Sequence, residues 1–210
     1  MKTKTKNFVS IILNSLLVIF VLIGIIFSSK QDGLGMFKFY TQDSNYLALI
    51  VSIIFLISQI LNRKTGKLPK FINLLRFIAT SCLFVTFTVV IFILIPSFGL
   101  DSAPKMLFAG SSLYFHTLCP LLSIISFIFF ENQLDYPTKA IIVPLIPTFI
   151  YACITLTLNV TNVLYGPYPF LHVHEQSVFM SFLWILIIFA IATLLAFSLY
   201  YLQKKFNKQK

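Results

Sequence analysis

Residues 108–131 read FAGSSLYFHTLCPLLSIISFIFFE, an apolar stretch that is long enough to cross a bilayer and that carries one histidine, His116. An ionisable side chain inside a membrane span is costly, and it marks a functional site by default. Imidazole is the side chain whose ordinary pKa lies closest to neutral, which suits it to proton transfer. The stretch therefore predicts a membrane protein in which His116 works with other polar residues.

The composition as a whole is that of a membrane protein, with 58% hydrophobic residues, 10% charged residues and a mean hydropathy of +0.92. No soluble domain of 210 residues has an interior large enough to bury that much apolar surface. The formal net charge is +10, but the basic residues occur in short runs between apolar stretches, so no nucleic-acid partner is expected. The three cysteines show neither a CxxC motif nor a zinc spacing, so no disulfide, metal site or other cofactor is predicted.

Six apolar stretches of about 20 residues or more predict an all-α fold, a bundle of six transmembrane helices in a single domain. Their expected limits are 8–29, 40–61, 71–95, 108–130, 139–161 and 176–202. The first stretch is too long for a signal peptide and lacks an A-x-A site, so it is expected to remain as a helix. Pro144 and Pro147 predict a kink or a broken first turn in the fifth helix.

The loops predict the orientation of these helices. Twelve basic residues fall on the side of the two termini and only three on the other side, while Arg76 lies just inside the third stretch. Because basic loops stay in the cytoplasm, both termini are predicted to be cytoplasmic, in a multi-pass protein of the cell membrane.

With that orientation, polar residues gather in the outer half of the bundle. Spacings of three and four place them on shared helix faces: Thr41, Ser44 and Asn45 in the second helix, and Ser112, His116, Cys119 and Ser123 in the fourth. We expect an outer-leaflet cavity lined by Thr41, Asn45, His116 and Asn159, and no ionisable group in the inner half. The alternative is that the hydroxyl groups bond within their own helices or hold helices together.

Two further polar features leave alternatives open. Asp43, near the outer end of the second helix, is either solvated at the interface or orients a histidine. His172, His174 and Glu175 form the sequence HVHE in the last outer loop. This could hold a metal, but an exposed HxH in a loop is a weak signal, and we predict no metal site there.

Two segments resemble the androgen-induced integral membrane proteins of animals and their bacterial six-span relatives. FKFYTQDSN (37–45) is similar to that family's aromatic-Lys-aromatic-x-Thr segment. FHTLCPLLSIISFIFFENQLDYP (115–137) is similar to its His-Thr-x-x-Pro helix with an acidic end and a Tyr-Pro exit. LLRFIAT (74–80) and YGPYPFL (165–171) also resemble the bacterial branch.

Animal members of this family are threonine hydrolases that cleave fatty acid esters of hydroxy fatty acids. The resemblance implies that Thr41 is the nucleophile and His116 the base of a lipid-ester hydrolase in a bacterial inner membrane, with membrane lipids as partners and an acyl-chain ester as substrate. Further candidates are the possible oxyanion donors Ser44, Asn45 and Asn159, and the possible partners of His116, which are Asp43, Ser112 and Cys119. The alternative is a non-catalytic membrane protein, either a small-solute transporter or a lipid-binding or partner protein.

Overall fold

The computed structural model describes residues 3–62, 68–131 and 135–207. The described residues contain helices and no strand, and six helical segments are long and apolar enough to cross a membrane. The expected all-α bundle of six spans is therefore confirmed, and the chain is a multipass membrane protein.

The first three spans contain the predicted stretches, with the first extending beyond 8–29 at both ends and the other two close to their predicted limits. They are formed by α1 (Thr3–Asp32), α2 (Tyr40–Leu61) and α3 (Lys70–Val89). A 3₁₀ segment, Gly33–Lys38, joins α1 to α2. The third span continues beyond α3 through a π-helical turn, Val90–Leu94, into α4 (Ile95–Phe98). The second span therefore begins one residue before Thr41, which lies in its first turn.

The predicted start of the fourth span at residue 108 is wrong. A separate short helix, α5 (Ala103–Phe108), ends there, and the chain turns at Gly110, whose φ of 53° favours glycine. The span itself runs from Leu113 to Phe130. It consists of α6 (Cys119–Ile125) between two π-helical segments, Leu113–Leu118 and Ser126–Phe130. His116 therefore lies in a π-helical turn, a feature that occurs frequently at functional sites.

The fifth span is broken near its first turn, as its two prolines predict. A 3₁₀ segment, Thr138–Ile142, precedes α7 (Leu145–Val160). A long connection follows, with a short 3₁₀ segment at Pro169–Leu171. The sixth span is α8 (Val178–Phe206), whose N-cap residue Ser177 accepts a hydrogen bond from the Met180 N–H at 3.2 Å.

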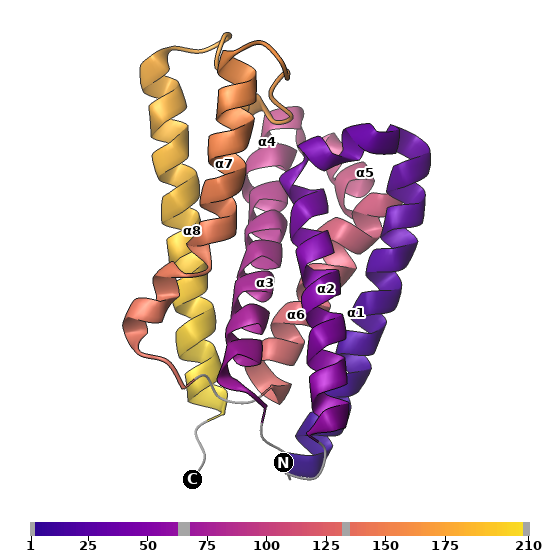
Figure 1. The fold of residues 1–210 in the computed structure, drawn as a ribbon. Helices are drawn as coiled ribbons and strands as arrows, with labels where there is room; N and C mark the ends of the chain where they lie inside the picture. The colour runs from indigo at the N-terminus through magenta and orange to yellow at the C-terminus, as the bar shows by residue number, and fades with distance from the viewer. Residues whose placement is uncertain (1–2, 63–67, 132–134, 208–210) are drawn as a thin grey trace.

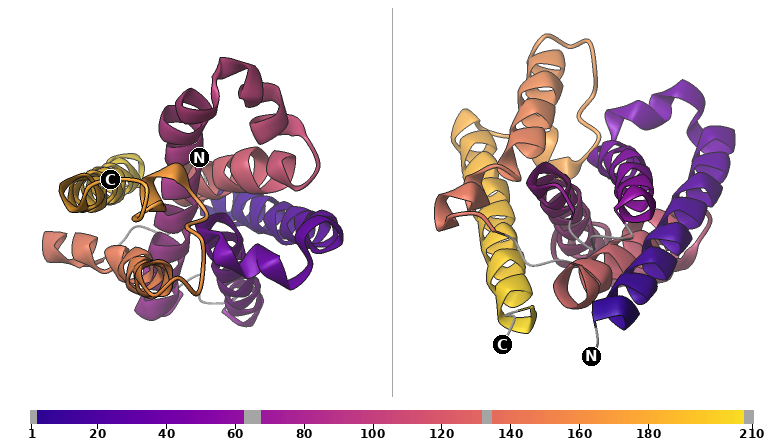
Figure 2. Two further views of the ribbon diagram at one scale, coloured as in Figure 1. Left: turned by 90° about the horizontal axis from the view of Figure 1, so that it is seen from above. Right: turned by 60° about the horizontal axis from the view of Figure 1, so that its bottom comes forward.

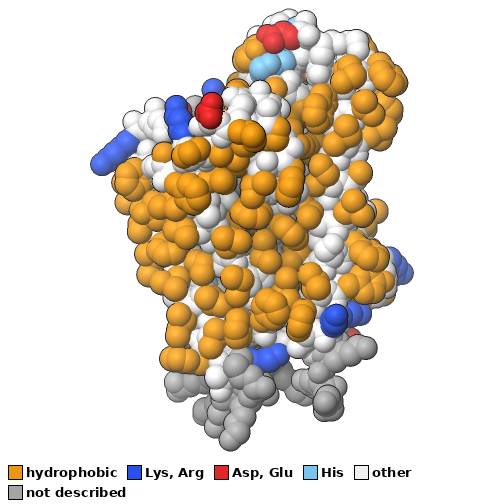
Figure 3. Space-filling view, turned by 180° about the vertical axis from the view of Figure 1, so that it is seen from behind, with side chains coloured by type: hydrophobic (Ala, Val, Ile, Leu, Met, Phe, Trp, Pro, Cys, Tyr) orange, Lys and Arg blue, Asp and Glu red, His pale blue; other side chains and the backbone are white. Residues whose placement is uncertain are grey.

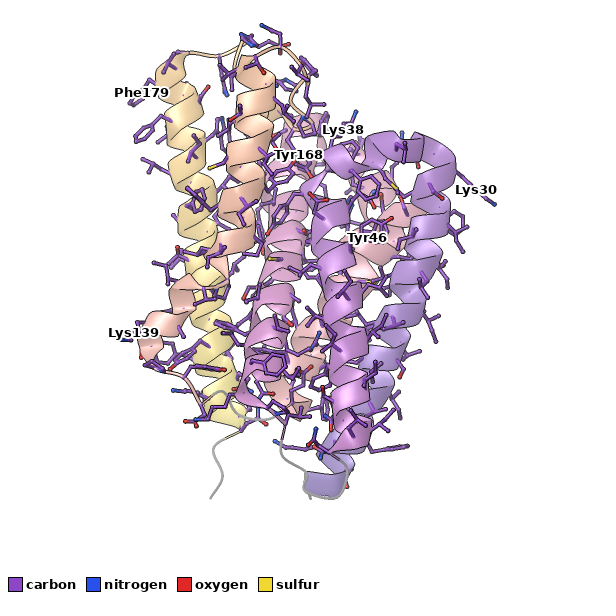
Figure 4. All side chains as sticks on the ribbon, in the orientation of Figure 1. Lys30, Lys38, Tyr46, Lys139, Tyr168 and Phe179 are labelled. Atoms are coloured by element: carbon purple, nitrogen blue, oxygen red, sulfur yellow. The ribbon has the colours of Figure 1, made fainter. Side chains whose placement is uncertain are left out.

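Both termini lie at one end of the bundle, here called the terminal end, and the opposite end is called the distal end (Figure 1). The helix α3 occupies the centre and packs against α2, α6 and α8, whereas α7 and α8 stand together at one side (Figure 2). We compared burial in the most apolar 18 residues of each span. In the third span 67% of these residues are buried, but in the sixth span only 6% are. Few residues of α8 are therefore fully buried, and the labelled Phe179 points outward (Figure 4).

The surface fits a membrane environment. Figure 3 shows apolar side chains over the whole middle of one face, with lysine, arginine, aspartate, glutamate and histidine side chains only toward the two ends. Large apolar residues such as Phe92, Phe149 and Leu194 are more than half exposed, at 71%, 58% and 64%. Burial in lipid accounts for such surfaces, because water-soluble monomers rarely expose large contiguous apolar patches.

Candidate functional site

A cavity adjoins Thr41 between the central helices and the α7–α8 pair. We call it the Thr41 cavity, and every side chain that lines it is uncharged. Its lining comes from α2, α3, α7, α8 and the 161–177 connection, and includes Thr41, Thr86, Val89, Thr148, Tyr168, Trp184 and Ile188. The space is narrow, about 60 Å³, which is room for only a few water molecules. The cavity therefore suits a slender apolar ligand.

Thr41 lies in a group of hydrogen-bonded polar residues from α2 and α3. The Ser44 hydroxyl donates to the Thr41 carbonyl at 3.1 Å and is hydrogen-bonded to the Thr86 hydroxyl at 2.9 Å. The Asn45 side-chain amide donates to the same Thr41 carbonyl at 2.8 Å. Ser44 and Asn45 therefore hold the first turn of α2 in place, and the bonds to carbonyl groups already use their donor hydrogens.

Tyr168 reaches Thr41 from the other side. It lies in the 161–177 connection, is only 8% exposed, and its hydroxyl accepts a hydrogen bond from the Thr41 N–H at 3.4 Å. Figure 4 shows the labelled Tyr168 between α7 and α2. Burial raises the pKa of Tyr168, and its hydrogen bonds with Thr41 offset part of that shift. The phenol is therefore protonated at neutral pH and retains a hydrogen to donate.

Asn159 fixes the connection that carries Tyr168. Its side-chain amide donates to the Leu164 carbonyl at 3.0 Å, and its side-chain oxygen accepts from the Val173 N–H at 3.4 Å. The chain folds back so tightly here that only glycine fits at position 166. A Cβ on Gly166 would lie 2.4 Å from the Leu171 carbonyl oxygen, which is too close. Asn159 thus reaches the site indirectly, by holding the loop, and it does not line the Thr41 cavity.

His116 lies in the fourth span and does not line the Thr41 cavity. Its Nδ1 is 2.6 Å from the Met106 carbonyl oxygen, and the neighbouring Thr117 hydroxyl donates to the Leu107 carbonyl at 2.8 Å. A carbonyl can only accept, so Nδ1 carries the hydrogen, and in the neutral ring Nε2 is then the basic nitrogen. Both bonds tie the end of α5 to the fourth span. The bond to Met106 also leaves Nε2 of His116 without a hydrogen, as a general base requires.

The structure does not bring together the four residues expected to line one cavity. Thr41 lines the Thr41 cavity, whereas Asn45, His116 and Asn159 do not, and no hydrogen bond joins Thr41 to His116. Their backbones are nevertheless neighbours, because the Asn45 amide donates both to the Thr41 carbonyl and, at 3.3 Å, to the Phe115 carbonyl. Thr41 and the residue before His116 thus lie close together, but the His116 side chain bonds to Met106 and does not line the Thr41 cavity.

The remaining candidates are spread around this centre. Asp43 is exposed and lines a second, wider groove between α2 and α7, together with Lys38 and Thr155. Cys119 is fully buried in a packed apolar cluster with Leu17 and Phe115. Ser112 precedes the π-helical turn of His116, and its side chain makes no capping hydrogen bond there.

The HVHE sequence forms a hydrogen-bonded cluster at the distal end. Tyr165 donates to Glu175 at 2.7 Å and lies 3.1 Å from His172 Nδ1, which is itself 3.3 Å from Glu175. His174 Nε2 lies 2.9 Å from the Asn159 carbonyl oxygen. Among the described residues, no three histidine, cysteine or acidic side chains are grouped so that they could hold a metal.

Sequence reasoning missed a buried ion pair near the terminal end. The Arg76 guanidinium donates to the Glu131 carboxylate through both Nε and Nη2, the latter at 2.7 Å, and the two side chains are 0% and 3% exposed. We expected no ionisable group in the half of the bundle near the termini, which the sequence predicts to be the inner half, and this expectation is wrong. Arg76 also donates to Ser52 at 3.1 Å and lies over the Phe55 ring.

Other polar side chains complete this cluster, which we call the Arg76 network. Asn14 and Ser126 donate to Glu131 at 3.3 and 2.8 Å, and Ser123 bonds to Thr80 at 2.8 Å. The network thereby joins the first four spans. The sequence signal was the position of two charged residues at the ends of apolar stretches. Glu131 is the last residue of one stretch, and Arg76 lies about one and a half turns inside another.

These features define a six-span membrane protein with an uncharged cavity at one half of the bundle and a buried ionic network at the other. Comparison with protein-family models, with curated proteins and with solved structures gave no significant match.

Proposed function

We propose that this protein is an intramembrane hydrolase of lipid esters, which holds the acyl chain of its substrate in the Thr41 cavity. The observation that carries the proposal is the position of Thr41, a polar residue in the wall of an uncharged and mainly apolar cavity. The resemblance of residues 37–45 and 115–137 to a family of threonine hydrolases supports the same residue as nucleophile.

The cavity is short along the bundle. Its lining residues on α8 run from Trp184 to Phe189, which corresponds to roughly 8 Å along the helix axis. A long acyl chain therefore fits only when the cavity widens. The cavity is narrow, and the lightly buried α8 forms one of its walls, so a small outward movement of the α7–α8 pair would admit a chain from the surrounding lipid.

The chemistry requires a base for the Thr41 hydroxyl, because a neutral hydroxyl is a weak nucleophile. We assign the base to His116 Nε2, with water carrying the proton between the two side chains. The Thr41 oxygen forms a bond to the ester carbon, and the tetrahedral intermediate expels the alcohol, which takes the proton back. Water, activated in the same way, then releases the fatty acid and restores Thr41, so that ester and water give acid and alcohol.

A second function is favoured by two specific observations. The lining of the Thr41 cavity includes no charged side chain, and Thr41 and His116 are not hydrogen-bonded to each other. Both fit a protein that binds the acyl chain of a lipid without cleaving it. Binding and hydrolysis use the same cavity, so one set of variants distinguishes between them.

The deciding experiment uses the purified protein in lipid nanodiscs with a long-chain p-nitrophenyl ester. Thr41→Val, which keeps the shape and removes the hydroxyl, should abolish hydrolysis, whereas Thr41→Ser should retain part of it. Binding of a non-cleavable alkyl ether of the same length, followed by quenching of the fluorescence of Trp184 in the cavity wall, should persist in Thr41→Val. Hydrolysis that disappears while binding remains identifies Thr41 as the nucleophile.

The matched control is Thr193→Val. Thr193 is an exposed residue of α8 whose hydroxyl donates to the Phe189 carbonyl of its own helix at 2.7 Å, and it does not line the cavity. The Thr193→Val variant should hydrolyse the ester at the rate of the parent protein. Undiminished hydrolysis in Thr41→Val would contradict the nucleophile assignment, and ether binding by a parent protein without esterase activity would leave lipid binding as the function.

The proposed site also needs the predicted orientation, in which the distal end faces outward from a bacterial cytoplasmic membrane. Reporter fusions placed after residues 66 and 210 should be active only as cytoplasmic reporters, and fusions at residues 103 and 168 only as external ones. The basis is the excess of lysine and arginine in the loops at the terminal end. An external reading after residue 210 would contradict this orientation and place the Thr41 cavity in the inner leaflet.

A further inference from the structure

The first turn of α2 presents N–H groups that have no acceptor within the helix, and the Thr41 N–H is one of them. The Gln42 and Asp43 N–H groups both donate to the Phe39 carbonyl, whereas the Thr41 N–H donates only to the Tyr168 hydroxyl, at 3.4 Å. The first N–H groups of any helix lack intrahelical acceptors, and the helix dipole adds a partial positive charge there. The long distance marks this bond as a weak one, which a better acceptor can replace.

The Tyr168 hydroxyl is the second group with a donor to offer. It accepts the bond from the Thr41 N–H, and the Thr41 side chain and the Tyr40 backbone also lie within hydrogen-bonding reach of it. Its side chain is 8% exposed, and it lines the same cavity as Thr41. The ring is held by stacking on Phe170, with centroids 5.2 Å apart, and by a tilted contact with Phe39 at 6.1 Å.

We infer that the Thr41 N–H and the Tyr168 O–H together form the oxyanion site of the proposed hydrolysis at Thr41, on which this inference rests. When the Thr41 oxygen bonds to the ester carbon, the carbonyl π electrons move to the carbonyl oxygen. That oxygen then accepts hydrogen bonds from both donors. These bonds take the place of the weak bond between the Thr41 N–H and the Tyr168 hydroxyl, and Tyr168 keeps its proton. Two fixed donors in a site without bulk water stabilise such charge strongly.

Tyr168 can donate to the oxyanion, whereas Ser44, Asn45 and Asn159 have donors that are already in use. The Ser44 hydroxyl and the Asn45 amide already donate to the Thr41 carbonyl, and the Asn159 amide donates to the Leu164 carbonyl. An oxyanion at any of these would have to displace a bond that stabilises the fold. Tyr168 is a catalytic residue in this scheme, because its hydroxyl touches the reacting carbonyl oxygen, and Asn159 is a positioning residue that holds its loop.

The test is Tyr168→Phe, compared with Tyr165→Phe in the same connection. Tyr165 is 65% exposed, and its hydroxyl faces Glu175 and His172 at the distal surface and not the cavity. For ester hydrolysis in nanodiscs, Tyr168→Phe should lower kcat by roughly 100-fold or more, with KM within about threefold, as when one oxyanion donor is removed. Tyr165→Phe should keep the parent values of both constants.

A binding measurement separates catalysis from a purely structural role as a cap on α2. A long-chain alkyl boronic acid adds the Thr41 oxygen to boron, gives a tetrahedral anion and releases one proton, so it imitates the charged intermediate. Tyr168→Phe should weaken its binding by roughly 100-fold and leave the affinity for the uncharged alkyl ether unchanged. Equal weakening of both ligands, or an unchanged kcat, would overturn the oxyanion assignment while Thr41-dependent hydrolysis remained. A parent protein without such hydrolysis would overturn the proposed function together with this inference.

Discussion

Glu131→Ala should destabilise the bundle by about 3–5 kcal/mol, the cost of leaving a buried charge without its partner. The reason is that Arg76 is fully buried and that Glu131 accepts its strongest hydrogen bonds. Asn14 and Ser126 would lose the same acceptor. We expect a clear drop in the thermal midpoint of the purified protein in mild detergent, followed by the fluorescence of Trp184.

Two matched variants sharpen this test. Replacing both charges, as Arg76→Met with Glu131→Leu, removes the need for a partner and should recover most of the lost stability. Asp135→Ala removes the acid of the Lys70–Asp135 pair, whose side chains are 68% and 78% exposed, and should leave the midpoint unchanged. If Glu131→Ala behaved like Asp135→Ala, the Arg76 network would contribute little to the fold.

The second large effect concerns His116 and separates its two possible roles. His116→Asn places an amide N–H near the former Nδ1, so it can still donate to the Met106 carbonyl, but it has no basic nitrogen. As a base, His116 contributes typically 10²–10⁴-fold, so His116→Asn should lose hydrolysis to that extent and keep the parent thermal midpoint. A purely structural histidine would show the reverse: retained hydrolysis in His116→Asn, and loss of stability only in His116→Ala.

The double variant adds a further check on the pair. Thr41 and His116 act in one proton transfer, so Thr41→Val combined with His116→Asn should be hardly slower than Thr41→Val alone. Rates would instead fall by the product of the two single effects if the residues acted independently. The measurement is the initial rate of release of p-nitrophenol in nanodiscs, corrected for the amount of folded protein.

Much of the fold could be predicted from the sequence, because a membrane imposes strong constraints on length and hydrophobicity. The start of α2 at Tyr40 and the broken start of the fifth span followed from the sequence pattern and from two prolines. The break before the fourth span did not, because a single glycine with positive φ separates α5 from the π-helical turn within one apolar run.

The site was harder to predict than the helices. Depth along a helix can be predicted from the sequence, but the direction of each side chain depends on packing. The π-helical turn shifts the helix face that His116 presents, so counting in threes and fours no longer applies to it. Tyr168 and Glu131 were missed because one lies in an irregular loop and the other at a helix end, where the partner is set by tertiary contacts alone.

The Arg76 network also bears on the order in which the protein is made. Its side chains come from residues 14 to 131, so all of them are synthesised before α7 and emerge from the ribosome before it. Chains fold from the N-terminus as they emerge, so the first four spans can close around Arg76 and Glu131 while the last helical pair is still missing. The Thr41 cavity, whose far wall is α7 and α8, would then be completed last, by a hairpin laid against an already assembled core.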